Sequence, residues 1–345
     1  MIRTLIAASL FVISTSFAAF SNDVTHTVVD FQDLEDWDKD DHEKALDAFL
    51  VTCPDLNDPD WSALCALAQQ KPDAKGFFEL FFRPVIIEDG DPALFTGYFE
   101  PELSGSLSPS ARYRYPLYRQ PPESVNAGLW YPRRVIETSN VMTGRGLEIA
   151  WVDDPVELFF LQIQGSGRVK LPSGRMIRVG YQGANGHEYR SIGAELVRRG
   201  VFEAHQVSAQ VIKNWVRRNP VAGQELLWSN PSYVFFRRVD SVPAERGPLG
   251  AMNRSVTTGR TIAVDPAFVP LGAPVWIEKE GANPIRRLMV AQDTGSAIKG
   301  AQRADVFMGT GDTAGREAGR LRDPGRMVTL LPIQRAYAME TEPGL

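Results

Sequence analysis

The chain contains few of the residues that build metal and thiol sites. Only two cysteines, Cys53 and Cys65, and four widely spaced histidines occur among its 345 residues. Zinc sites in proteins use three or four ligands at characteristic short spacings, and no such pattern is present. Neither a metal nor another cofactor is therefore expected. The formal net charge of −5 leaves no basic excess, which argues against nucleic acid as a partner.

Long apolar runs are equally scarce outside the N-terminus. There, Arg3 precedes a largely apolar run from Leu5 to Phe17, and the small residues Ala18 and Ala19 follow. This order is typical of a secretory signal peptide, which we place at residues 1–19. A buried N-terminal helix is the alternative. The run is shorter than the roughly 20 residues of a membrane span, and no cysteine near the cleavage point offers a site for a lipid. A soluble periplasmic protein without a membrane anchor is expected.

The two cysteines are expected to pair with each other. In an exported protein a close pair such as Cys53 and Cys65 is typically a disulfide. Closing so short a loop contributes about 3 kcal/mol in the chain-entropy treatment. A metal-binding or catalytic role is the alternative, and no further Cys or His lies close by to support it.

Helical spacing of apolar residues is confined to a few segments. Two helices are predicted between Glu43 and Gln70, with Pro54 separating them. Three more are predicted over His187–Arg199, Ser208–Arg218 and Val221–Trp228. The acidic stretch over residues 20–45 is expected to be a solvated leader.

Short apolar, aromatic and β-branched runs between Gly and Pro turns predict strands elsewhere. The predicted strands are Gly76–Ile87, Phe95–Phe99, Tyr115–Tyr118, Glu157–Gln164, Asn230–Phe236, Arg260–Val264, Pro274–Ile277, Leu288–Ala291, Asp305–Met308 and Met327–Leu331. Many short strands of this kind favour a small closed barrel over repeated βαβ units.

Three aspartates at predicted strand ends are the strongest candidates for chemistry. Asp293 follows one predicted strand, Asp305 opens the next, and a Gly-rich loop carrying Lys299 lies between them. Asp265 ends an earlier strand. Carboxylates beside Gly-rich loops lie where a ligand can approach the backbone closely. The alternative for each aspartate is that it caps a turn by bonding its own backbone.

Other catalytic patterns are incomplete. Asp293-Thr294-Gly295 resembles an aspartic-protease signature, but that chemistry needs two facing carboxylates and the chain has only one such motif. Ser166 lacks the Gly-x-Ser-x-Gly spacing of a hydrolase elbow. Carboxylate acid–base chemistry remains, which is typical of enzymes that cut glycosidic bonds. Nearby tyrosines and glutamines suit sugar faces and hydroxyls, although half-buried packing is the alternative for any single tyrosine.

From about Leu94 to the C-terminus, the chain resembles the membrane-bound lytic murein transglycosylase A family. The matching stretches are Phe95–Pro101, Gln164–Gly167, Gly180-Tyr181, Asn185–Gly193, Asn230–Phe236, Asp265-Pro266 with Pro270–Gly272, Asp293–Gly295 with Ala297–Gly300, and Asp305. Family members are typically lipoproteins, and this chain has no lipid-accepting cysteine near residue 19.

The resemblance implies a mainly β fold with some α. It implies a double-psi β-barrel domain, an inserted second β-rich domain and a helical N-terminal segment. The expected boundaries are 20–100 for the helical segment and first part of the barrel domain, 101–237 for the insert, and 238–345 for the remainder of the barrel.

The resemblance also implies the reaction. The family cleaves the β-1,4 bond between N-acetylmuramic acid and N-acetylglucosamine without water and leaves a 1,6-anhydromuramic acid end. By this likeness Asp305 is the acid/base, Asp293 the second carboxylate that tunes it or stabilises the transition state, and Asp265 a structural residue. The expected substrate contacts are Tyr98, Gln164, Ser166 and Lys299.

Two other functions remain open. An inverting glycoside hydrolase on the same fold would use Asp293 as the base that activates water. A non-catalytic peptidoglycan-binding protein would hold glycan strands without cutting them. In each case the expected partner is the peptidoglycan glycan strand and a monomer is expected, while partners in the cell-wall machinery are unknown from the sequence.

Overall fold

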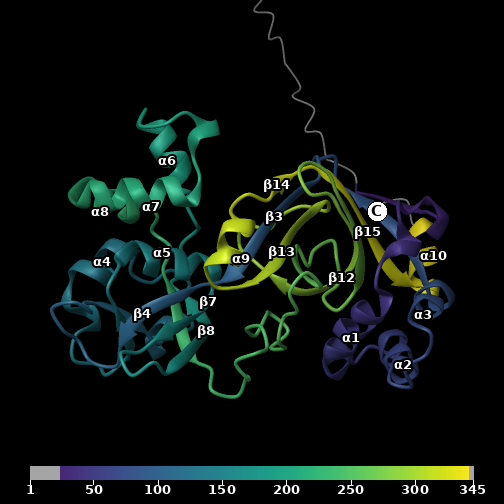
Figure 1. Cartoon of the computed structure of the whole chain (residues 1–345), viewed down its shortest axis with the longest axis horizontal. Helices are drawn as coiled ribbons and strands as arrows, with labels where there is room; N and C mark the ends of the chain where they lie inside the picture. The colour runs from purple at the N-terminus through teal and green to yellow at the C-terminus, as the bar shows by residue number, and fades with distance from the viewer. Residues whose placement is uncertain (1–23, 342–345) are drawn as a thin grey trace, which may run out of the picture.

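The computed structural model describes residues 24–341, so the predicted signal peptide at 1–19 lies outside the described residues. The fold is mixed α/β and mostly sheet, with two sheets side by side (Figure 1). The nine-stranded sheet contains β1 (Thr25–Val28), β2 (Phe82–Glu88), β3 (Leu94–Glu100), β10 (Thr261–Val264), β11 (Pro274–Lys279), β12 (Ile285–Thr294), β13 (Arg303–Thr310), β14 (Arg322–Asp323) and β15 (Gly325–Pro332). The six-stranded sheet contains β4 (Glu102–Ser106), β5 (Tyr115–Tyr118), β6 (Glu148–Val152), β7 (Ser166–Lys170), β8 (Met176–Ala184) and β9 (Val234–Arg238).

The six-stranded sheet is an insertion into the nine-stranded one, because β4 to β9 all lie between β3 and β10 in the chain. The larger sheet has the order β1-β2-β15-β11-β12-β10-β13-β3-β14. The smaller sheet has the order β5-β6-β4-β7-β8-β9. The larger order ends at β1 and β14, and no pairing among the described strands closes it into a barrel.

Helices lie at the N-terminal end, around the insert and near the C-terminus. They are α1 (His42–Thr52), α2 (Pro59–Ala68), α3 (Ala74–Phe81), α4 (Arg133–Thr138), α5 (Pro155–Gln164), α6 (Ile192–Arg198), α7 (Ala209–Arg218), α8 (Pro220–Trp228), α9 (Gly311–Ala318) and α10 (Ile333–Thr341). As predicted, Pro54 separates the first two helices, and it lies in a 3-10 turn between them. The predicted disulfide between Cys53 and Cys65 is confirmed.

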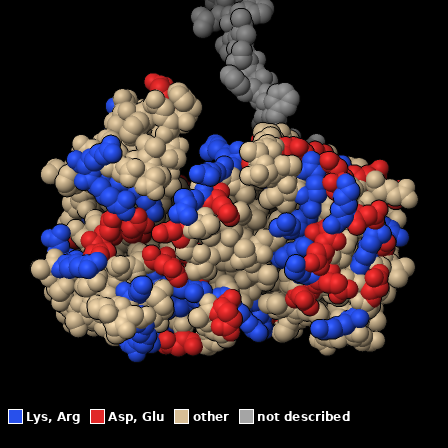
Figure 2. All heavy atoms as spheres, in the orientation of Figure 1, with Lys and Arg blue, Asp and Glu red and all other residues tan. Residues whose placement is uncertain are grey.

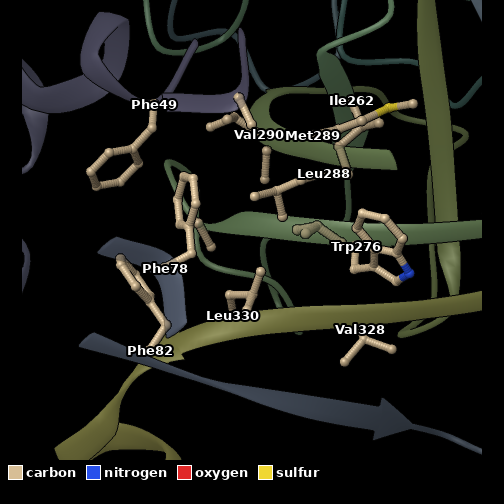
Figure 3. Close-up of a cluster of buried hydrophobic side chains, with 14 of the residues drawn as sticks. Phe49, Phe78, Phe82, Ile262, Trp276, Leu288, Met289, Val290, Val328 and Leu330 are labelled. Atoms are coloured by element: carbon tan, nitrogen blue, oxygen red, sulfur yellow. The ribbon is translucent and has the colours of Figure 1, made fainter. Parts of the chain in front are cut away.

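Aromatic side chains fasten α1 and α3 to the larger sheet (Figure 3). Phe49 of α1, Phe78 of α3 and Phe82 of β2 are fully buried. The ring of Phe82 lies 6.1 Å from that of Phe49 and 5.8 Å from that of Phe78. Edge-to-face and tilted contacts at such distances add about 0.5–1.5 kcal/mol to the burial of each ring. The N-terminal helices are therefore part of the same core as the sheet.

The prediction that the acidic stretch at the N-terminus is a solvated leader is wrong for part of that stretch. Trp37 is only 4% exposed, and Asp40 accepts two hydrogen bonds from the buried Arg260, at 2.6 and 2.9 Å. Asp40 also accepts from the backbone N–H of Leu288 on β12. The segment packs on the sheet because its carboxylates meet arginines that the strands would otherwise bury without partners.

Two predicted strands are wrong in whole or in part. The first half of Gly76–Ile87 is helix α3, and only the part from Phe82 is strand; the Asp73 side chain accepts from the Gly76 N–H and caps the helix. Glu157–Gln164 is helix α5, whose cap is Asp154. Short apolar runs fit a strand and a buried helix face equally well, and here the capping residues decide.

Smaller differences concern element ends. The helix predicted from His187 begins at Ile192, and the strand predicted from Asn230 begins at Val234. The residues before these starts form loops. The buried Asn185, just after β8, donates to the carbonyls of Tyr131 and Pro231, and the buried Asn230 accepts from the backbone N–H of Arg190. The five predicted strands after residue 259 are confirmed as β10, β11, β12, β13 and β15.

Candidate active site

The two principal aspartates lie in one cross-strand row of the larger sheet. Ala263 on β10 is the register partner of Asp293 on β12 and also of Asp305 on β13. On its other side Asp305 is the register partner of Thr96 on β3. Register partners project from the same face of a sheet. Asp293 is the second-last residue of β12 and Asp305 the third residue of β13, so both lie near strand ends as predicted, and one small side chain, Ala263, separates them.

Asp305 has one oxygen bonded and one available. Its Oδ1 accepts a hydrogen bond of 2.7 Å from the Thr96 hydroxyl, whose oxygen accepts in turn from Arg303 Nη2 at 2.8 Å. No hydrogen bond within residues 24–341 involves Oδ2 of Asp305. Burial raises the pKa of Asp305, and the Thr96 hydrogen bond and the Arg303 charge partly oppose that rise. The arrangement suits a carboxyl group that exchanges a proton through Oδ2.

Asp293 is surrounded by donors. Its Oδ1 accepts from the backbone N–H groups of Ala251 and Thr294, both at 2.9 Å, and its Oδ2 accepts from the Tyr98 hydroxyl at 3.0 Å. Burial raises the pKa of Asp293 to about 6, and its three donors limit the rise. The negative charge of Asp305 adds a smaller upward contribution. Each of the three donors favours the ionised form of Asp293, and burial opposes that form.

Tyr98 connects strands that are not neighbours. It lies on β3, and β13 and β10 separate that strand from β12. Neighbouring strands are about 4.8 Å apart, so the bond from Tyr98 to Asp293 requires the sheet to curl toward this face. The Tyr98 ring packs 5.2 Å from that of Phe307, and burial together with the nearby Asp293 charge raises the pKa of the tyrosine well above its usual value. Tyr98 is therefore a neutral donor inside a concave face.

Asp265 holds the Gly-rich loop in place. The residue is 6% exposed, and its two oxygens accept from the backbone N–H groups of Ala267 at 3.2 Å and Gly300 at 3.1 Å. Lys299 Nζ lies 3.5 Å from Asp265 Oδ1, and the lysine side chain is 67% exposed. Asp265 thus acts within a turn, and its hydrogen bonds and ion pair are with Ala267, Gly300 and Lys299 rather than with the Asp293–Asp305 pair.

Gln164 and Ser166 lie where the insert meets β3. Gln164 ends α5, and its Oε1 accepts a 3.0 Å hydrogen bond from the backbone N–H of Phe99. Ser166 begins β7 and is 8% exposed. The Gln164 side-chain carbonyl therefore joins the insert to β3, the strand that carries Tyr98.

Three site residues were not predicted. Thr96 and Arg303 form the hydrogen-bond chain to Asp305, and Ala263 keeps the space between the aspartates open. Thr96 lies within the Phe95–Pro101 motif, but its role depends on the parallel pairing of β3 with β13. Only that register could have identified it.

The described residues contain no cluster of three or more His, Cys, Asp or Glu side chains that could hold a metal ion. Between residues 24 and 341, no helix combines the length and apolar character that crossing a bilayer requires. The space-filling view has a notch between the part of the molecule that carries α6 to α8 and the part that carries the larger sheet (Figure 2).

Two segments of the chain match known protein families. Residues 94–237 match the MltA specific insert domain, and residues 260–331 match the 3D domain. The membrane-bound lytic murein transglycosylase A of Vibrio cholerae is 32% identical over 264 residues, which cover 72% of this chain and 69% of that protein.

Solved structures agree with this assignment. The membrane-bound lytic murein transglycosylase of Agrobacterium tumefaciens is 31% identical, with a TM-score of 0.80 over 91% of this chain and 99% of that one. The Escherichia coli MltA with bound chitohexaose is 26% identical, with a TM-score of 0.70 over 85% and 89% of the two chains. The family expected from the motifs is confirmed: the chain belongs to the membrane-bound lytic murein transglycosylase A family.

Proposed function

We propose that this chain is a lytic transglycosylase of peptidoglycan that cleaves the MurNAc–GlcNAc bond without water and leaves a 1,6-anhydroMurNAc end. Family membership supports the reaction. The observation that carries the assignment to this site is the Asp305–Ala263–Asp293 row, in which a carboxyl with a raised pKa keeps one oxygen unbonded. An E. coli relative binds a hexasaccharide, which supports a glycan as the ligand.

Asp305 is the proposed acid and then the base. Its protonated Oδ2 donates to the glycosidic oxygen as the bond from that oxygen to C1 of the muramic acid breaks. The C6 hydroxyl of the same sugar then attacks C1 and gives its proton to the Asp305 carboxylate. The intramolecular hydroxyl needs no positioned water and benefits from a high effective molarity. Thr96 and Arg303 hold Oδ1 and leave Oδ2 to the substrate.

Asp293 is the proposed second carboxylate. Its charge, fixed by Tyr98 and two backbone N–H groups, stabilises the positive charge that develops at C1 in the transition state. Asp305 lies across Ala263 from this carboxylate, and burial favours the protonated form of Asp305 before reaction.

Four further residues are proposed to contact the glycan: Tyr98, Gln164, Ser166 and Lys299. Tyr98 offers a ring face and a hydroxyl beside the carboxylates, and Lys299 is exposed on the adjoining loop. For Asp265 we propose a structural role, which its bonds to the Ala267 and Gly300 N–H groups support.

We further propose that the nine-stranded sheet is a double-psi β-barrel domain. Residues 20–100 supply the N-terminal helical segment and the first part of this barrel, and residues 238–345 supply the remainder. The six-stranded unit at 101–237 is then the inserted domain, and the 3D-domain match supports the first part of this proposal. Export to the periplasm, where peptidoglycan lies, and action as a monomer are proposed with it.

Product analysis tests the function. Purified protein is incubated with isolated peptidoglycan, and the released fragments are identified by mass spectrometry. Fragments that end in 1,6-anhydroMurNAc support the proposal. Reducing ends that have gained a water would instead indicate an inverting hydrolase, and binding with no release would indicate a glycan-binding protein.

A further inference from the structure

Glu100 is a buried carboxylate and the last residue of β3. After β3 the chain leaves the larger sheet and enters β4 of the smaller one (Figure 1). Its partners come from both sheets. From the larger sheet, the Thr310 hydroxyl at the end of β13 donates to Oε2 at 2.8 Å. From the smaller sheet, Arg168 Nε on β7 lies 2.8 Å from Oε2, and Arg178 Nε on β8 lies 2.7 Å from Oε1. One fully buried side chain therefore joins the two sheets.

The two arginines depend on this carboxylate. Arg168 and Arg178 are register partners on β7 and β8, and their side chains are only 14% and 7% exposed. Like charges directly opposite each other in a sheet repel, and burial strengthens the repulsion. Glu100 supplies the negative charge that allows both guanidinium groups to lie side by side in the interior.

The same arginines also hold the chain as it returns from the insert. Arg168 Nη2 donates to the carbonyl of Ala244 at 2.7 Å. Arg178 Nη2 donates to the carbonyl of Arg246 at 2.7 Å, and its Nη1 donates to the carbonyl of Pro243 at 3.2 Å. Both crossings between the sheets, outgoing at Glu100 and returning at 243–246, thus meet at one charged cluster.

The cluster lies in line with the proposed glycan contacts. Alternate residues of a strand face the same side, so Thr96, Tyr98 and Glu100 share one face of β3. By the same rule Ser166 and Arg168 share one face of β7. The bond between Glu100 and Arg168 therefore connects the row that carries the site's tyrosine to the row that carries Ser166.

We propose that Glu100, with Arg168 and Arg178, sets the spacing between these two rows and thereby the width of the glycan site. These are positioning residues: they act on the affinity for glycan and leave the chemistry at Asp305 unchanged. The inference rests on the proposed function, because it assumes that the glycan contacts both rows.

Glu100→Gln tests the inference, since it removes the charge and keeps the shape. We expect KM for peptidoglycan to rise about tenfold, with kcat and the pH–rate profile unchanged, because the change affects binding that is common to ground state and transition state. Glu102→Gln is the matched control. Glu102 lies two residues away and 4.0 Å from Arg168, but its side chain is 43% exposed, so this variant should behave as wild type.

An unchanged KM in a folded Glu100→Gln protein would overturn the inference, whether or not kcat falls. If Glu100→Gln does not fold, Thr310→Val replaces it. That variant removes only the bond from the larger sheet and leaves both arginine pairs, so KM should still rise about threefold. An unchanged KM in Thr310→Val would then overturn the inference.

The dissociation constant for chitohexaose, measured by calorimetry, separates failure of this inference from failure of the proposed function. A wild-type protein that binds the sugar but releases no anhydro fragments would refute the function and still permit the test. In that case a Kd about tenfold weaker in Glu100→Gln than in Glu102→Gln supports the inference, and equal values contradict it.

Discussion

Replacing Asp293 by asparagine should change how the stability of the protein depends on pH. Burial holds the pKa of Asp293 at about 6 in the folded chain, against an ordinary value of 3.8. The folded state therefore binds the Asp293 proton more tightly than the unfolded state does. From this residue the wild type loses stability as pH rises from about 4 to about 6, and it does not regain it at higher pH.

The magnitude follows from the two pKa values. Each pH unit between them corresponds to about 1.4 kcal/mol, so the full loss is about 3 kcal/mol. Asparagine does not titrate, and its amide can accept from the backbone at Oδ1 and donate to the Tyr98 oxygen. The free energy of unfolding of Asp293→Asn, relative to wild type, should therefore increase by about 3 kcal/mol between about pH 4 and pH 7.

Urea unfolding followed by circular dichroism, at a series of pH values, measures this difference. Asp47→Asn provides a control for removal of one negative charge, because Asp47 is exposed on α1. For the control, the difference from wild type should stay flat across the series. A flat difference for Asp293→Asn as well, to within about 0.5 kcal/mol, would refute the reasoning that burial raises the pKa of this carboxyl.

Three further substitutions test the roles of Tyr98, Ala263 and the disulfide. Tyr98→Phe removes one donor from Asp293, so the pKa of Asp293 in the folded state should rise further and the stability loss should extend to higher pH; an unchanged upper limit in the same urea series would contradict this. Ala263→Val adds bulk between the two carboxylates and should cost about 1–3 kcal/mol of stability and most of the activity, so wild-type murein release by this variant would show that the space is not needed. Cys53→Ser opens the disulfide loop and should lower the unfolding free energy by about 3 kcal/mol with unchanged activity, whereas unchanged stability under oxidising conditions would show that the bond contributes nothing.

Some residues of the candidate site can be predicted from the sequence, and others cannot. Asp293 and Asp305 could be identified because aspartates beside a Gly-rich loop are unusual and because their motifs match a family. Thr96 could not be, because its hydrogen bond to Asp305 spans 209 positions and exists only through the pairing of β3 with β13. Glu100 was likewise part of a recognised stretch, but its role depends on two strands of the insert.

The helices and strands likewise differ in how well the sequence predicts them. The C-terminal strands were predicted correctly because they are short, apolar and bounded by turns. Helix α5 was mistaken for a strand because its apolar run suits either structure, although Asp154-Pro155 at its start and Gly165 at its end are ordinary helix boundaries. The acidic leader was taken as solvated because nothing local reveals that Asp40 pairs with Arg260, 220 positions away.

The role of Asp305 as acid and base can be tested by measuring murein release by Asp305→Asn. The variant keeps an oxygen that accepts from Thr96 but cannot donate and then recover a proton, so chemistry should stop while folding persists. We expect Asp305→Asn to melt cooperatively at or above the wild-type temperature at neutral pH, to bind chitohexaose and to give no detectable anhydroMurNAc product. Release of anhydroMurNAc fragments at the wild-type rate would contradict it.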